Sequence, residues 1–187
     1  NSGKPDYYET VLAEFQTAYR ESGNEQLQKF AQKIDSRKRF QALPGHEMKI
    51  EGYLVNGTKF DWEPFRGKVV LIDFWATWCG PCLGEIPNMK ANWEKYHDRG
   101  FEIIGIAVCD KTEAVKKHLQ KSNTPWTILD DQQFIDAGNE SIADYYGIDG
   151  IPVMVLIGRD GKVISLEARG EQLNAELEKL FPKNEQK

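Results

Sequence analysis

The chain has 187 residues, of which 40% are hydrophobic and 28% are charged, as is typical of a globular protein with one core and a small appendage. Its 24 basic and 29 acidic residues give a formal net charge of −5, which argues against a nucleic-acid partner bound through bulk electrostatics. The sequence contains no run of the roughly 18 apolar residues that a membrane span needs. Three cysteines are too few for a disulfide scaffold and indicate one functional pair plus one extra thiol.

Residues 1–43 are predicted to form a helical N-terminal extension. Apolar residues recur at helical spacing on both sides of a stop at 22–24, so we expect a helical hairpin over 6–40 with a solvated basic end at 37–39. We expect a packing appendage or the tail of a missing N-terminal domain; the alternative is a partner-docking arm. Because the chain begins with Asn1 and shows no signal-peptide pattern, we also expect that a native signal, anchor or preceding domain has been removed.

Residues 44–187 are predicted to form one α/β domain. A break at 43–45 precedes a β-hairpin around the turn Asn56-Gly57. Apolar strand patterns and amphipathic helices follow. The expected elements are a buried strand at 69–75, a helix after Cys82 that ends near Gly100, a strand at 101–108, a helix at 112–120 capped by Thr112, a strand at 127–129, a polar loop at 130–139, a helix at 142–146, an antiparallel strand pair at 152–157 and 163–167, and a closing helix at 171–181.

The stretch around which the chain is organised lies at the end of the apolar run 69–75. It places Cys79, Gly80, Pro81 and Cys82 where a strand gives way to a helix. Pro81 suits the first helical turn, where its missing N–H is not needed. Cys79 would then lie at the helix N-terminus, where unpaired amides and the macrodipole lower a thiol pKa from about 8.5 to roughly 3.5–7.5. Two cysteines on one helical turn can also close a disulfide with little backbone movement.

These residues carry a family resemblance. The run Trp78-Cys79-Gly80-Pro81-Cys82 resembles the thioredoxin active-site motif, and its flanks at 74–78, Glu85 and Pro87 resemble the TlpA/ResA branch of extracytoplasmic thiol-disulfide oxidoreductases, with an AhpC/TSA-Redoxin-like domain. The resemblance covers roughly Gly45 to the C-terminus. It implies an α/β thioredoxin-like fold, a central mixed β-sheet flanked by helices, with an N-terminal β-hairpin and a central αβ insertion before the last strand pair.

The resemblance also implies roles for four side chains. Cys79, the exposed cysteine in thioredoxin-like proteins, would be the nucleophile, and Cys82 would resolve the mixed disulfide. Asp73 lies six residues before Cys79, where thioredoxin has a buried Asp that helps to move the proton of the resolving cysteine. Glu85 would lie near the thiols and tune them. The alternatives are a hydrogen-bonded core acid at Asp73 and an ordinary exposed first-turn glutamate at Glu85.

The expected partner-binding residues are Trp78, Gly80, Pro81, Ile151 and Pro152. In thioredoxin-like folds the proline that starts this strand is cis and lies against the disulfide, and the residue before it pairs with the substrate backbone. The resemblance therefore implies a cis bond before Pro152; the alternative is a trans proline at a strand start. Trp78, next to the nucleophile, would be partly exposed and face the substrate.

No metal or further cofactor is expected beside the redox-active disulfide Cys79–Cys82. A tetrahedral metal site would need a second cysteine pair or paired histidines, whereas His46, His97 and His118 are scattered and read as surface or satisfied residues. Haem attachment would need a histidine where Leu83 stands, and no GxGxxG follows a strand. The remaining thiol, Cys109, reads as a small buried hydrophobe; the alternative is a third redox thiol.

The expected function is thiol-disulfide exchange on disulfide-containing or dithiol protein partners, as a reductant supplied by an upstream electron-donor protein. By resemblance the protein would be periplasmic, or membrane-anchored through the removed N-terminal segment. One alternative is a peroxiredoxin-like thiol peroxidase, but its PxxxTxxC pattern is broken by Ile72 and by Thr77, only two residues before Cys79. The other is a non-catalytic thioredoxin-fold binding module, which the intact motif argues against.

Overall fold

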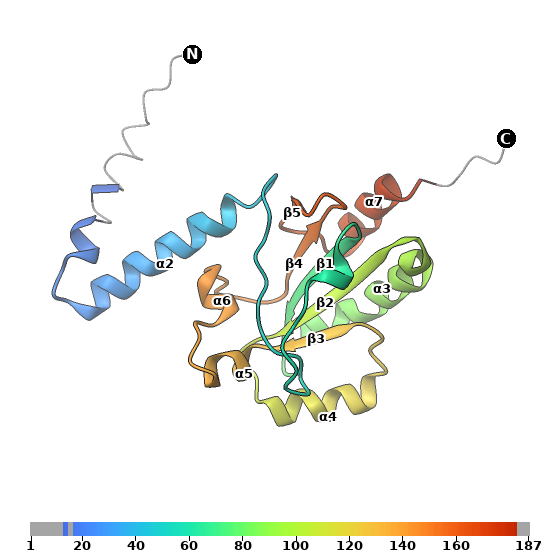
Figure 1. Cartoon of the computed structure of the whole chain (residues 1–187), viewed down its shortest axis with the longest axis horizontal. Coiled ribbons are helices and arrows are strands. Elements are labelled where there is room, and N and C mark those ends of the chain that lie inside the picture. The colour runs from blue at the N-terminus through green and yellow to red at the C-terminus, as the bar shows by residue number, and fades with distance from the viewer. Residues whose placement is uncertain (1–12, 15–16, 183–187) are drawn as a thin grey trace, which may run out of the picture.

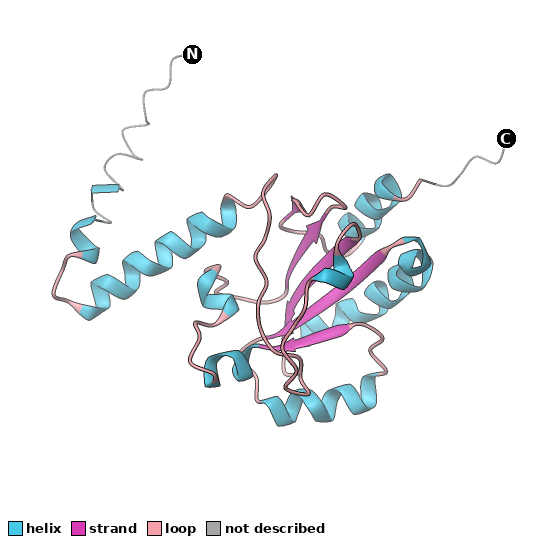
Figure 2. Cartoon of the chain, viewed as in Figure 1, coloured by secondary structure: helices cyan, strands magenta, loops and turns pink. Residues whose placement is uncertain are grey.

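The structure is a computed structural model that describes residues 13–14 and 17–182. A five-stranded mixed sheet has the strand order β3-β2-β1-β4-β5 (Figures 1 and 2). β1 pairs in parallel with β2, β2 pairs in parallel with β3, and β4 runs antiparallel to both β1 and β5. The strands are β1 Val69–Trp75, β2 Phe101–Ala107, β3 Thr127–Asp130, β4 Val153–Ile157 and β5 Val163–Ser165.

Helices cover the sheet and frame its ends (Figure 2). They are α2 Glu25–Gln41, α3 Gly80–Tyr96, α4 Thr112–Ser122, α5 Asp131–Asp136, α6 Ile142–Tyr145 and α7 Glu171–Leu180, with short 3-10 turns η1 Glu63–Phe65 and η2 His97–Arg99. β1 is buried along its whole length, as its continuous apolar run predicts. Val69 and Leu71 join a core with α3, α4 and α7, whereas Val70 and Ile72 join a second core on the other side. The predicted mixed α/β sheet is confirmed.

The predicted hairpin around Asn56-Gly57 is only partly formed. The turn closes, because the Leu54 N–H donates to the Thr58 carbonyl at 2.8 Å, but a single bridge between Tyr53 and Lys59 follows it. Backbone pairing goes instead to β3, where Leu54 forms a bridge with Leu129. The segment thus covers the β3 edge of the sheet, and residues 44–47 form bridges along β5 at the opposite edge.

Two further local predictions are wrong. Residues 130–139 are not all loop, because α5 begins at Asp131 and the Asp130 side chain caps it by accepting from the Gln132 N–H. Thr112 does not cap α4; it is the first helical residue, and Lys111 holds the cap position without a side-chain hydrogen bond. The other predicted strands and helices are confirmed within a few residues.

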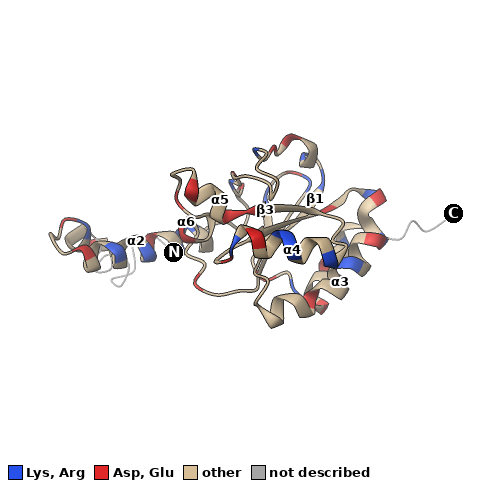
Figure 3. Cartoon of the chain, turned by 90° about the horizontal axis from the view of Figure 1, so that it is seen from below, with Lys and Arg blue, Asp and Glu red and all other residues tan. Residues whose placement is uncertain are grey.

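The second helix of the predicted extension is confirmed as α2, which starts at the cap residue Asn24. The first helix, predicted from residue 6, falls mostly outside the described residues. The basic end is exposed at Arg37 and Lys38, as expected, but it also contacts the domain. Arg37 lies 2.6 Å from an Asp149 carboxylate oxygen, and the Arg39 guanidinium lies 3.9 Å above the Tyr145 ring. The basic part of α2 therefore docks beside α6, where Figure 3 shows the two helices as neighbours.

None of the helices in the described part of the chain combines the length and the apolar character that a membrane span requires.

The α2 contact depends on a close backbone approach at Gly147. This residue has φ +62°, and a Cβ there would lie 2.7 Å from the Arg37 backbone nitrogen. Gly147→Ala should therefore combine left-handed strain with overpacking and lower the free energy of unfolding by about 2–4 kcal/mol, measured by urea unfolding. Gly150→Ala is the matched control, because its Cβ would meet nothing within 4 Å. Equal stability of the two variants would contradict the close approach.

Candidate active site

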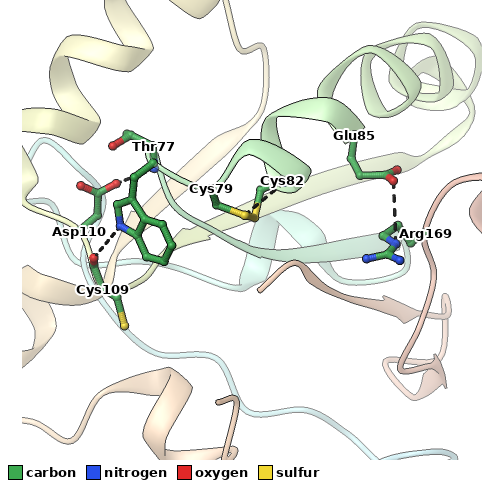
Figure 4. Close-up of a disulfide and its surroundings, with 8 residues drawn as sticks. Thr77, Cys79, Cys82, Glu85, Cys109, Asp110 and Arg169 are labelled. Carbon is green, nitrogen blue, oxygen red and sulfur yellow. Dashed lines mark hydrogen bonds and ion pairs between the residues drawn. A yellow bond between two sulfur atoms is a disulfide. The ribbon is translucent and has the colours of Figure 1, made fainter. Parts of the chain in front are cut away.

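The two cysteines of the motif lie where β1 leads into α3. Cys79 is the N-cap residue of α3, and Gly80 and Pro81 open the helix. The Cys79 sulfur accepts a hydrogen bond from the Cys82 backbone N–H at 3.2 Å. The two residues form a disulfide with an Sγ–Sγ distance of 2.00 Å (Figure 4). The expected position of Cys79 at a helix N-terminus is confirmed, so its sulfur lies where backbone N–H groups favour negative charge.

Both cysteines are buried in this oxidised form. Cys79 is 4% exposed and Cys82 is 2% exposed, so the expectation that the first cysteine is the exposed one is wrong here. The bond to Cys82 holds the Cys79 sulfur against the first turn of α3, and both side chains belong to an apolar cluster with Trp75 and Ala76. A partner would therefore reach the sulfur through the neighbouring exposed residues Gly80 and Pro81.

Asp73 lies inside the sheet, on β1, as predicted. It is 4% exposed, and its Oδ1 has no hydrogen-bond partner among the described residues. Burial, and then the negative charge of Glu85, raise the pKa of Asp73 to about 8. The carboxyl group therefore holds a proton at neutral pH and gains or loses it near the working range of thiol chemistry.

Glu85 links α3 to the segment before α7. One carboxylate oxygen accepts from the Gly170 N–H at 3.1 Å, and the other lies 3.9 Å from Arg169 Nε, the contact drawn in Figure 4. Its side chain is 21% exposed, so the alternative of an ordinary exposed first-turn glutamate is wrong. Arg169 and Gly170 were missed from the sequence, because nothing local marks partners that lie about 85 positions away.

The loop between β1 and α3 is held against the end of β2. The Thr77 N–H donates to an Asp110 carboxylate oxygen at 2.6 Å, and the Trp78 indole N–H donates to the Cys109 carbonyl at 3.0 Å (Figure 4). Trp78 is 63% exposed, as predicted, whereas Trp75 is buried in the core. The N–H edge of the indole ring is thus held by a hydrogen bond, whereas the faces of the ring remain exposed to solvent beside the disulfide.

The bond between Ile151 and Pro152 is cis, which confirms the prediction from the resemblance. Both residues are half-buried where β4 begins. Ile151 packs against the apolar cluster that contains both cysteines. Val153 at the start of β4 pairs with Phe74 of β1, so the start of β4 lies at the end of the strand that leads to the redox pair.

Cys109 is not the buried hydrophobe that the sequence predicts. Its side chain is exposed, because β2 ends at Ala107 and Cys109 takes a left-handed φ of +51° that turns the chain away from the core. Partial burial, together with the negative charges of Asp131 and Asp144, raises the pKa of its thiol. Figure 4 shows its sulfur pointing away from the disulfide. A raised pKa keeps the thiol protonated and weakens it as a nucleophile.

His97 and His118 are half-buried, and each has one buried ring nitrogen, Nδ1 and Nε2 respectively, without a hydrogen-bond partner among the described residues. His97 Nδ1 lies 3.5 Å from a Glu102 oxygen, and His118 packs beside Trp75. Within residues 13–14 and 17–182, no group of three or more His, Cys, Asp or Glu side chains could hold a metal ion.

Comparison with known proteins agrees with this geometry. Residues 24–180 match the Redoxin family. Thiol-disulfide oxidoreductase ResA from Bacillus thuringiensis is 36% identical over 129 residues, which are 69% of this chain and 70% of that protein. ResA from Bacillus subtilis is 30% identical over 60% of this chain and 59% of its own length.

Solved structures give the same fold. The thioredoxin domain of a thiol-disulfide oxidoreductase from Bacteroides vulgatus aligns with a TM-score of 0.64 and 28% identity, over 73% of this chain and 96% of that one. A thiol:disulfide interchange protein from a Bacteroides species has a TM-score of 0.64 and 27% identity, over 78% and 93%. The chain therefore belongs to the Redoxin family, as a thioredoxin-like thiol-disulfide oxidoreductase of the TlpA/ResA type.

Proposed function

We propose that this oxidoreductase reduces disulfides in protein partners through the Cys79–Cys82 pair, with no other cofactor. The observation that carries the proposal is the position of Cys79 as the N-cap of α3, with the Cys82 N–H directed at its sulfur. In the reduced protein this N–H and the helix dipole stabilise a Cys79 thiolate, which is the attacking species in thiol-disulfide exchange.

The exchange takes place in two steps. The Cys79 thiolate attacks one sulfur of the partner disulfide, the partner S–S bond breaks, and its second sulfur leaves as a thiolate that takes a proton. In molecules whose Asp73 carboxyl group is deprotonated, a fraction that grows as the pH rises toward 8, the Cys82 thiol gives its proton to Asp73 and attacks the Cys79 sulfur. The remaining partner sulfur leaves as a thiolate and takes that proton, which releases the partner as a dithiol. Two electrons pass to the partner, and the protein ends as the Cys79–Cys82 disulfide. An upstream donor protein must then return two electrons, and one proton is taken up to restore the Cys79 thiolate and the Cys82 thiol.

Partner binding is assigned to the exposed residues around the disulfide. Trp78 presents an apolar ring, and Gly80 and Pro81 leave the backbone beside Cys79 accessible. Ile151 and Pro152 supply the strand start along which the partner backbone would lie. By family resemblance we place this reaction outside the cytoplasm, on disulfide-containing or dithiol proteins.

The functional test is reduction of insulin disulfides with dithiothreitol as the electron source. Cys79→Ser should abolish turnover, whereas Cys82→Ser should still attack and accumulate a mixed disulfide with the partner, visible on a non-reducing gel. Cys109→Ser is the matched control and should keep full turnover, because its thiol is not part of the pair. Loss of turnover in Cys109→Ser, or rapid hydrogen peroxide consumption by the unmodified chain, would contradict the proposal.

The direction of electron flow is tested by the reduction potential of the pair, measured in graded dithiothreitol or glutathione buffers with trapping of free thiols. We expect a value near or below about −250 mV, on the reducing side of the range from thioredoxin to the strong oxidases. A value near about −120 mV would show that the reduced form is stabilised, and the protein would then oxidise its partners.

Asp73→Asn tests the proton acceptor. Removing the base should slow release of the mixed disulfide by about 10²-fold and abolish the rise in its rate with pH through about 8. Stopped-flow measurement between about pH 6 and 9 would show this.

Unfolding supplies a second readout of the same carboxyl group. Because the folded-state pKa of Asp73 lies above its unfolded value of about 3.9, the folded chain binds the extra proton and loses stability as pH rises from about 4 to 8. The Asp73→Asn variant should lack that loss. If Asp73→Asn changed the stability but left the pH profile of mixed-disulfide release unchanged, Asp73 would have only a structural role.

A further inference from the structure

An open groove of about 580 Å³ adjoins the start of β4. Phe40 and Gln41, at the C-terminal end of α2, form one wall. Residues 152–154 form the floor, and residues of the segment before and at the start of α7 form the other wall. The groove is thus built from the thioredoxin-like sheet and from the N-terminal extension together.

The α2 wall is fixed in place. Lys33 and Arg37 both pair with the Asp149 carboxylate, at 2.7 and 2.6 Å. Arg39 stacks on the ring of Tyr145, and the α2 backbone passes close to Gly147. Because these contacts all join α2 to the segment that leads into β4, the helix end holds a defined position beside the groove floor.

The groove is continuous with the redox site at two points. Pro152 lines the groove, and Ile151 before it packs against the cluster that contains Cys79 and Cys82. On the other wall, Arg169 lies 3.9 Å from Glu85, which stands on the same helix as the cysteines. A polypeptide whose cysteine meets Cys79 and whose backbone follows the start of β4 would therefore place its flanking residues in this groove.

The lining indicates the chemistry of those flanking residues. Both walls and the floor present apolar side chains, with Phe40, Val153 and Leu166 half-buried. Glu167 on the rim is exposed and forms no ion pair with any described residue, whereas Arg169 has Glu85 as its partner. Because the positive charge of Arg169 is offset by Glu85, the unpaired carboxylate of Glu167 leaves this wall of the groove with a net negative charge.

We propose that α2 is a partner-specificity element: this groove takes the extended segment next to the reactive cysteine of a protein disulfide, with preference for apolar and basic residues. The proposal rests on the function proposed above and names the class of partner. Glu167 then attracts a lysine or arginine of the partner. The size and charge of Gln41 on the opposite wall determine the space and the electrostatic environment that this partner side chain finds in the groove.

Two synthetic peptides test this. Each is an extended peptide with one cysteine, which forms a mixed disulfide with thionitrobenzoate (TNB) and has a leucine on either side. In one peptide the residues two positions before and after the cysteine are lysines, and in the other they are glutamates. The Cys79 thiolate attacks the peptide sulfur and releases TNB, which is measured by absorbance. Cys82 then releases the peptide thiol, so each turnover converts the protein dithiol to its disulfide. DTNB, which has no flanking residues, is the small reference substrate.

Gln41→Lys places a positive charge on the α2 wall. We expect it to slow TNB release from the lysine peptide by about threefold and to speed release from the glutamate peptide by a similar factor, with the effect shrinking at high salt. The rate with DTNB should not change. Gln32→Lys is the matched control, since it makes the same change at an exposed position of the same helix outside the groove.

A second variant tests the opposite wall. Glu167→Lys should reverse the preference between the two peptides, whereas Glu94→Lys, an equal charge change at an exposed position of α3, should not. Identical peptide rates for Gln41→Lys and Gln32→Lys, with normal DTNB reduction, would overturn the role of α2. If the unmodified chain fails to reduce DTNB at all, the proposed function itself is overturned.

Discussion

The site depends on the burial of β1 on both faces. Alternate side chains of this strand enter two separate cores, so a slip of one residue would exchange the two sets and is excluded by packing. That fixed register determines where the strand ends at Trp75 and, a few residues later, where α3 begins. Cys79 becomes the N-cap of α3 as a result. The reactive position is therefore set by apolar packing throughout the domain, and the local contacts of Thr77 and Trp78 refine it.

Two carboxyl groups near the disulfide have opposite environments. Asp73 is buried, and its Oδ1 has no partner among the described residues, which disfavours its charge, whereas Glu85 accepts from the Gly170 N–H and lies near Arg169. Because Gly170 holds Glu85 in place, its negative charge acts on Asp73 at a constant position. Burial, and then this charge, raise the pKa of Asp73 to about 8, so the carboxyl group exchanges protons near neutral pH.

Most features that depend on contiguous residues could be predicted from the sequence, whereas few contacts between residues far apart in the chain could be. The cysteine pair, its place at a helix start and the buried β1 follow from contiguous residues, so pattern and resemblance were sufficient. The hairpin around Asn56-Gly57 was overestimated because its strand found a better partner in β3, which no local pattern reveals. Cys109 was misread because one left-handed residue redirected its side chain. The contacts of Glu85 and Arg37 join segments more than 80 positions apart and are decided only by the tertiary fold.

The extension packs against the chain that leads to the site. Asp149 and Gly147 are held by α2, and only a few residues later Val153 pairs with Phe74 of β1. The intervening segment, which contains the cis bond before Pro152, is thus fixed at one end by ion pairs and close backbone packing and at the other by the central sheet. Loosening α2 would free one of these two ends. The position of the strand start that we propose to bind partners and the shape of the adjoining groove therefore depend on the same helix.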